Sequence, residues 1–127
     1  MGIAIDSINP KHLQLYGNGG KMLSYNNSVF RYDDLQENAI ELAGEADFKF
    51  DSTDYILFYG QGTTRWNYSA ADHQFHHELN FYSDTNYYFL TYNANNGKRI
   101  QLQLSDNNPA THTITSFDDY AFHEQES

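Results

Sequence analysis

The densest group of chemically capable side chains is the segment 72–78, which reads Asp-His-Gln-Phe-His-His-Glu. Histidine nitrogens and carboxylate oxygens bind zinc, but a metal site needs several such ligands to converge on one point. The segment has the composition of a strand, and a strand sends alternate side chains to opposite faces. His76 and Glu78 then share one face, whereas Phe75 and His77 share the other. We therefore expect a structural role, with His77 buried and hydrogen-bonded and His76 directed to solvent; zinc binding is the alternative.

A second group is acidic and occupies the polar segment Asp-Ser-Thr-Asp at residues 51–54. Calcium takes about six to eight oxygen ligands, many of them from loops of this composition. The same side chains can instead cap a turn through local hydrogen bonds to the backbone. No loop of the chain has the ligand spacing of a known calcium motif. We expect Asp51 and Asp54 to cap the turn, keep them as the calcium candidates, and predict no cofactor.

A nucleophile with its activating partners is not recognisable in the sequence. The chain has no cysteine, which excludes a thiol nucleophile and thiolate metal ligands, and it has no Gly-x-Ser-x-Gly turn. Carboxylates are frequent in a chain with 17 acidic residues, so no pair of them stands out as a glycosidase dyad. The sequence therefore predicts no catalytic residue and no enzymatic activity for this chain.

A third group is aromatic and follows the glycine-containing turn at residues 60–64. The segment Arg65-Trp66-Asn67-Tyr68 could place Trp66 on the surface. Exposed aromatic rings on a β-sandwich can stack on the pyranose rings of sugars, and they also serve as anchors for protein partners. The alternative is that both rings belong to the core or its rim, with their polar atoms at the water interface.

Charge and hydropathy narrow the range of partners. The chain has 127 residues, the size of one domain, and a formal net charge of −10. Nucleic acids and anionic membrane surfaces require a basic footprint, so both are unexpected partners. No apolar run approaches the ~18 residues of a membrane span. The first residues also lack the basic start and long apolar stretch of a signal peptide.

The elements that must position these side chains are strands. The chain contains 11 Tyr, 9 Phe and one Trp but a single valine, Val29, so the core must combine aromatic residues with leucine and isoleucine. Turn signals recur about every 8–12 residues, the spacing of a sandwich or barrel. We expect about nine or ten strands, with candidates at residues 13–15, 21–25, 39–43, 48–50, 55–60, 64–68, 74–79, 87–92, 98–104 and 111–117.

Two hairpins and two central strands follow from this pattern. Strands 13–15 and 21–25 flank a glycine turn, and strands 87–92 and 98–104 flank an Asn-Asn-Gly turn. Residues 55–59 and 87–92 are apolar on both faces, which predicts central strands covered on both sides. The best-fitting fold is an all-β, two-layer antiparallel sandwich of jelly-roll type, with a closed barrel second.

Four sequence blocks also occur in a recognisable order. They are DYILFYGQG at residues 54–62, WNY at 66–68, FxHxxNxYSD at 75–84 and YYFLT at 87–91. Flanking blocks agree: INPxxLxLYG at 8–17, DLxE at 34–37, GKRI at 97–100 and SFDDY at 116–120. Together they resemble the N-terminal, non-catalytic region of PorU-type proteins, which are gingipain-like cysteine peptidases that act as sortases of the type IX secretion system.

The resemblance implies an accessory domain. The family's activity needs a His and Cys pair in a later domain, so no catalytic residue carries over to this chain. Residues 1–127 are then expected to form one sandwich module of a longer protein, at the cell surface or outer membrane of a Gram-negative bacterium. The module would dock onto the downstream peptidase domain or onto the secretion machinery. We expect the docking face to include the following aromatic residues: Trp66, Tyr68, Phe117, Tyr120 and Phe122. A carbohydrate-binding sandwich is the alternative.

Overall fold

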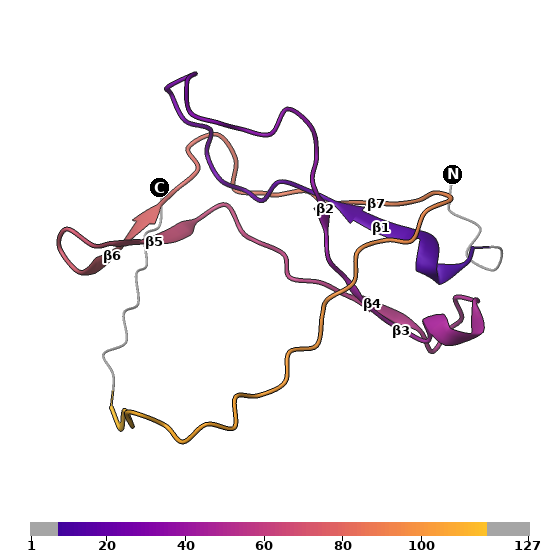
Figure 1. Ribbon diagram of the computed structural model, residues 1–127. Coiled ribbons are helices and arrows are strands. Elements are labelled where there is room, and N and C mark those ends of the chain that lie inside the picture. The colour runs from indigo at the N-terminus through magenta and orange to yellow at the C-terminus, as the bar shows by residue number, and fades with distance from the viewer. Residues whose placement is uncertain (1–7, 117–127) are drawn as a thin grey trace.

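The computed structural model describes residues 8–116, and this part of the chain is built from short strands (Figure 1). The strands are β1 (Leu13–Tyr16), β2 (Glu37–Asn38), β3 (Glu41–Ala43), β4 (Tyr55–Leu57), β5 (Arg65–Ser69), β6 (Gln74–Glu78) and β7 (Phe89–Tyr92). Two 3-10 turns, η2 (Pro10–His12) and η3 (Glu45–Asp47), complete the elements. The strands form three antiparallel sheets, in the orders β2-β1-β7, β3-β4 and β5-β6. No helix among the described residues is long and apolar enough to cross a membrane.

Strand β1 is the centre of the structure because it has a neighbour on each side. Leu15 is opposite Asn38 on β2 and opposite Leu90 on β7. Both leucines of β1, Leu13 and Leu15, are buried, and so is Gln14 between them. The carboxamide oxygen of Gln14 accepts a hydrogen bond of 2.5 Å from Asn93 Nδ2, which satisfies the buried polar group.

The core is small and aliphatic. Its buried members are Ile8, Leu13, Leu15, Ile40 and Leu42, and Phe50, Ile56 and Tyr88 pack against them while partly exposed. Most of these residues lie on or next to β1, β3, β4 and β7, so the core lies where the first two sheets meet, and Ile8 and Phe50 join it from loops. The β5–β6 hairpin contributes no member to this cluster.

A second set of contacts ties residues 97–100 to the core. Ile40 donates its backbone N–H to Lys98 and accepts one from Ile100, which forms an isolated parallel bridge at Arg99. Gly97 donates to the carbonyl of Lys11. A Cβ at Gly97 would collide with the carbonyl oxygen of Leu13, so only glycine fits this approach.

The prediction that residues 55–59 and 87–92 form central strands is wrong for the described structure. Strand β4 pairs only with β3, and β7 pairs only with β1, so both lie at sheet edges. Three of the four β7 side chains are large and hydrophobic, and all four are exposed. An apolar run shows that a strand needs cover on both faces, but it does not show that the same chain supplies that cover.

The two predicted hairpins are also wrong. Strand β1 does not pair with residues 21–25, because Gly17 donates to the carbonyl of Gln36 and brings β2 alongside instead. Residues 98–104 do not return along β7, because the contacts of residues 97–100 lead the chain across β1 toward Ile40. In both cases a long-range contact outweighs the local turn signal.

Some of the remaining strand predictions are confirmed and others are wrong. Those at residues 13–15, 39–43, 64–68 and 74–79 are confirmed with small shifts of their ends. The structure has no strand at residues 21–25, 48–50 or 98–104, nor in the described part of 111–117. The chain is therefore mostly β structure in several small antiparallel sheets, as far as residues 8–116 show.

Candidate functional site

The β5–β6 hairpin is the best-formed candidate for a functional surface. In Figure 1 it lies apart from the other two sheets. Its five-residue strands pair along their full length, from Arg65 opposite Glu78 to Ser69 opposite Gln74. Because a strand alternates its side chains, this register sorts the hairpin into one aromatic face and one polar face.

The aromatic face is made of two cross-strand pairs. Trp66 is opposite His77 with ring centroids 5.4 Å apart, and Tyr68 is opposite Phe75 at 5.3 Å. Such pairs stabilise an antiparallel ladder and hold the rings in fixed positions. The side chains of Trp66, Tyr68 and Phe75 remain solvent-accessible, with exposed fractions from 43% for Trp66 to 64% for Phe75. His77 is half-buried. We call these four residues the aromatic face.

The polar face carries the opposite set of side chains. Asn67 Nδ2 donates to Glu78 Oε2 at 3.4 Å, and His76 Nε2 lies 2.6 Å from Asp72 Oδ2. The pKa of Asp72 is held below its ordinary value, first by a hydrogen bond from the Ser69 side chain and then by His76. These contacts stabilise the hairpin on its polar face and do not cover the aromatic face.

The turn of the hairpin, at residues 70–73, is closed by its own side chains. His73 has a φ of 58°, the left-handed conformation that favours glycine. The Tyr68 hydroxyl lies 3.0 Å from His73 Nδ1, and Asp72 Oδ1 accepts the backbone N–H of Gln74. The Tyr68 hydroxyl thus contacts the His73 side chain, while Asp72 fixes the backbone of the residue that follows His73.

The histidine predictions are confirmed in part. The register places Phe75 and His77 on one face and His76 on the other, as the alternation requires. His76 is exposed, as expected, but His77, whose ring contacts that of Trp66, is half-buried rather than buried. Within residues 8–116 no group of three or more His, Cys, Asp or Glu side chains is placed to hold a metal ion.

The two calcium candidates have structural roles in the described loop. Asp51 Oδ1 accepts hydrogen bonds from the backbone N–H and the hydroxyl of Thr53, at 2.8 and 2.7 Å. Those bonds lower the pKa of Asp51. Asp54 Oδ2 accepts the backbone N–H of Asp51 at 2.9 Å. Both carboxylates therefore cap the turn, which confirms the structural expectation.

The predicted docking residues divide into two groups. Trp66 and Tyr68 lie on the same face of β5, and both are exposed. Phe117, Tyr120 and Phe122 lie outside the described residues. Sequence reasoning treated β5 and β6 as separate strands and so missed that Phe75 and His77 complete the surface. The polar residues between the two strands could have indicated a hairpin turn that pairs β5 with β6.

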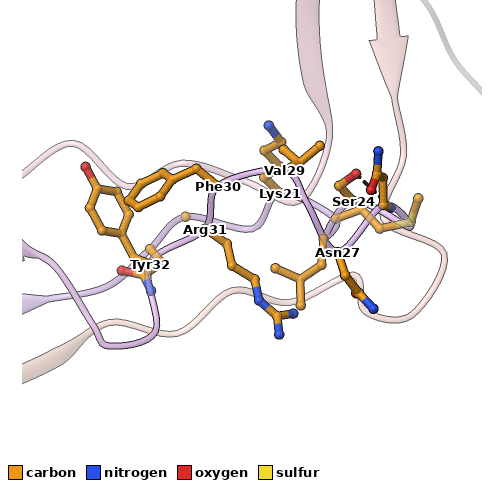
Figure 2. Close-up of a pocket in the computed structure, with 12 residues that line it drawn as sticks. Lys21, Ser24, Asn27, Val29, Phe30, Arg31 and Tyr32 are labelled. Atoms are coloured by element: carbon orange, nitrogen blue, oxygen red, sulfur yellow. Dashed lines mark hydrogen bonds between the residues drawn. The ribbon is translucent and has the colours of Figure 1, made fainter.

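A second surface feature, which the sequence did not suggest, is a pocket in the long loop between β1 and β2 (Figure 2). Its volume is about 360 Å³, and most of the residues between Asn18 and Tyr32 line it. Phe30 and Tyr32 pack edge to face, with centroids 5.1 Å apart. Figure 2 shows the charged ends of Lys21 and Arg31 pointing to opposite sides of the loop, so the two cations do not converge on one ligand.

Comparison of the chain with known protein families, with curated proteins and with solved structures finds no match. The geometry of the aromatic face therefore has to support a functional proposal by itself.

Proposed function

We propose that this chain is a non-catalytic accessory and interaction domain that precedes the peptidase domain of a gingipain-like cysteine peptidase of the PorU type. On this proposal the parent protein is a type IX secretion sortase at the cell surface or outer membrane of a Gram-negative bacterium. The partner is the downstream peptidase domain of the same chain or a protein of the secretion machinery. The chain itself contributes binding, and the chemistry belongs to the peptidase domain.

The aromatic face is the observation that supports this proposal. Tyrosine, tryptophan and phenylalanine are enriched at protein interfaces, and a few such anchors supply most of the binding free energy. Here Trp66, Tyr68 and Phe75 stand on one face, and their ring pairs and the bonds behind them fix their positions. A surface ordered before binding loses little conformational entropy when a partner covers it, which favours affinity.

The same proposal extends to the fold. The described sheets leave large side chains of β4 and β7 uncovered, including Tyr55, Leu57 and Phe89. We propose that the small sheets form the two layers of a jelly-roll-like sandwich when the module is joined to its partner. The exposed side chains of Tyr55, Leu57 and Phe89 would then become covered, as the composition of β4 and β7 requires.

A carbohydrate-binding module is the second candidate, and one observation favours it. Trp66 and Tyr68 are two residues apart on one strand and one face, which spaces them about 7 Å apart along the strand. Two exposed rings in a row can stack on neighbouring sugar units. The Tyr68 hydroxyl and His73 would then supply polar contacts beside the stack.

Calorimetry separates the two candidates. The downstream peptidase domain is titrated with the full chain and with two variants, Trp66→Ala and Asn67→Ala. Asn67 is the matched control because it lies on β5 between the two rings but on the polar face. The proposal expects binding that weakens about 100-fold in Trp66→Ala and stays within a few-fold in Asn67→Ala, in line with an aromatic hot spot. Absence of binding to the peptidase domain, together with quenching of Trp66 fluorescence by a soluble polysaccharide, would favour the carbohydrate-binding candidate.

A further inference from the structure

Residues 101–116 form an extended arm that leaves the body of the described structure (Figure 1). Every residue of this arm is exposed, and Leu102 and Leu104 are 91% and 83% accessible. The arm has no strand partner within residues 8–116. Two leucines exposed to this degree are unusual in a folded monomer, which normally buries such side chains.

The arm nevertheless has the pattern of a strand. Leu102 and Leu104 alternate with Gln101 and Gln103, so the leucines project to one side and the amides to the other. A strand of this kind can cover its apolar side by joining a sheet, where its backbone groups bond to a neighbouring strand instead of to water. The arm therefore has the properties of a strand that can add to the open edge of a sheet.

The outer edge of β7 is open to receive such a strand. Asn93 donates its N–H to the carbonyl of His12, which marks that pair as hydrogen-bonded across β1 and β7. Because hydrogen-bonded and non-hydrogen-bonded pairs alternate in an antiparallel ladder, Leu90 and Tyr92 direct their backbone groups away from β1. No described strand lies on that side.

The open edge also continues the apolar face of the core. Leu90 and Tyr92 are opposite Leu15 and Leu13 in the sheet and share their face. The leucines of β1 are 4% and 5% exposed, whereas Leu90 and Tyr92 are 42% and 54% exposed. A further strand beside β7 with leucines on this face would cover them.

The arm of one molecule is held away from its own β7 edge. The bonds of Gly97 to Lys11 and of Ile100 to Ile40 carry the chain across β1, to the side opposite β7. Arg99 reinforces this path through hydrogen bonds to the carbonyls of Pro10 and Lys11. The hairpin that the Asn-Asn-Gly turn favours is therefore not formed within one chain, but the same strand pairing can form between two chains.

We infer that two copies of this chain exchange their arms: residues 101–104 of one copy add as a strand beside β7 of the other. Each copy has one donor and one acceptor, so reciprocal exchange closes a two-fold symmetric dimer with no strand left over. Backbone hydrogen bonds give the added strand its affinity, and the alternating leucines give it register. This dimer does not depend on the proposed function, because the aromatic face on β5–β6 takes no part in it.

Sedimentation of the full chain between about 1 and 200 μM tests the inference, with two charge-matched variants. Leu102→Glu and Gln103→Glu each add one negative charge to adjacent positions, but only Leu102 is on the leucine side. Neither change touches a packed side chain in the described monomer, since both residues are exposed. We expect a wild-type dimer, an unchanged dimer in Gln103→Glu, and a dissociation constant raised about tenfold or more in Leu102→Glu. A wild-type chain that stays monomeric throughout, or a dimer that Leu102→Glu leaves unchanged, would overturn the inference.

A peptide experiment then locates the contact. An isotope-labelled Leu102→Glu chain, which keeps an open β7 edge, is mixed with an unlabelled peptide of residues 98–110. We expect the backbone amides of Leu90 and Tyr92 to become protected from hydrogen exchange, and a peptide carrying the same Leu102→Glu change to have no effect. Protection that appears elsewhere and spares these two amides would refute the placement beside β7.

Discussion

Replacing Arg99 by alanine is the sharpest test of how the core is held together. Arg99 Nε donates to Glu45 Oε2 at 2.8 Å, and its two other nitrogens donate to backbone carbonyls before and within β1 at 3.0 to 3.3 Å. The Arg99 and Glu45 side chains are only 20% and 31% exposed. One side chain thus joins residues 98–100 to η2, to β1 and to η3.

The expected loss can be worked from these contacts. Each hydrogen bond contributes about 1 kcal/mol net, and the charged pair with Glu45 contributes about 2 kcal/mol before allowance for its partial exposure. Some of these carbonyls will bond to water when the guanidinium is removed, which offsets part of the loss. We therefore expect Arg99→Ala to lower the free energy of unfolding by about 3 kcal/mol. Arg99→Lys should recover only about 1 kcal/mol, because an ammonium group lacks the fork that reaches several carbonyls at once.

Urea denaturation followed by circular dichroism measures this loss. A change of about 3 kcal/mol corresponds to a fall of about 2 M in the unfolding midpoint for a domain of this size. The matched control is Arg31→Ala, which removes an exposed arginine from the β1–β2 loop and should alter stability by less than about 0.5 kcal/mol. If Arg99→Ala and Arg31→Ala lowered the free energy of unfolding equally little, the Arg99 guanidinium would not be what links residues 98–100 to η2, β1 and η3.

Three further predictions concern single positions. Gly44 has a φ of 89°, and a Cβ there would overlap the Asp54 carboxylate, so Gly44→Ala should cost about 1–3 kcal/mol in urea, whereas Gly62→Ala, with open space around it, should be nearly neutral. The pKa of Asp72 is lowered in the folded hairpin, so its stabilisation is present above the ordinary carboxyl pKa near 3.9 and is lost as the pH falls through the lower folded value. Amide NMR should show the β5–β6 turn opening in that acid range in the wild type, and Asp72→Asn should lack this transition. Phe89→Ala should cost about 1 kcal/mol in the isolated chain rather than the ~3–5 kcal/mol of a closed core, because Phe89 is more than half exposed; a large loss would show that the Phe89 side chain is packed in solution.

The parts of the fold that sequence predicted are those set by local pattern. The alternation of Leu13 and Leu15 defines β1, and the alternation of Phe75 and His77 places both on one face of β6, the aromatic face. These predictions hold because a strand's two-residue period is a property of the backbone itself.

The pairing of strands could not be predicted in the same way. Gly17 looked like part of a hairpin turn, but its N–H bonds to Gln36 and its Cα lies against the Tyr88 ring. The Asn-Asn-Gly sequence also looked like a hairpin turn, but Gly97 is fixed against Lys11 instead. Both outcomes depend on residues far away in the sequence, which a local turn signal does not contain. The apolar character of β4 and β7 was read correctly, but the cover it requires is not within the described residues.

Hydrogen exchange of the chain, alone and with the downstream peptidase domain, tests the central claim most directly. The claim is that the aromatic face on β5 and β6 is the docking surface of a non-catalytic domain. It predicts strong new protection of backbone amides in Arg65–Ser69 and Gln74–Glu78 on complex formation, and loss of this protection in Trp66→Ala but not in Asn67→Ala. A complex that forms without protecting either strand, or a peptidase domain that does not bind the chain, would contradict it.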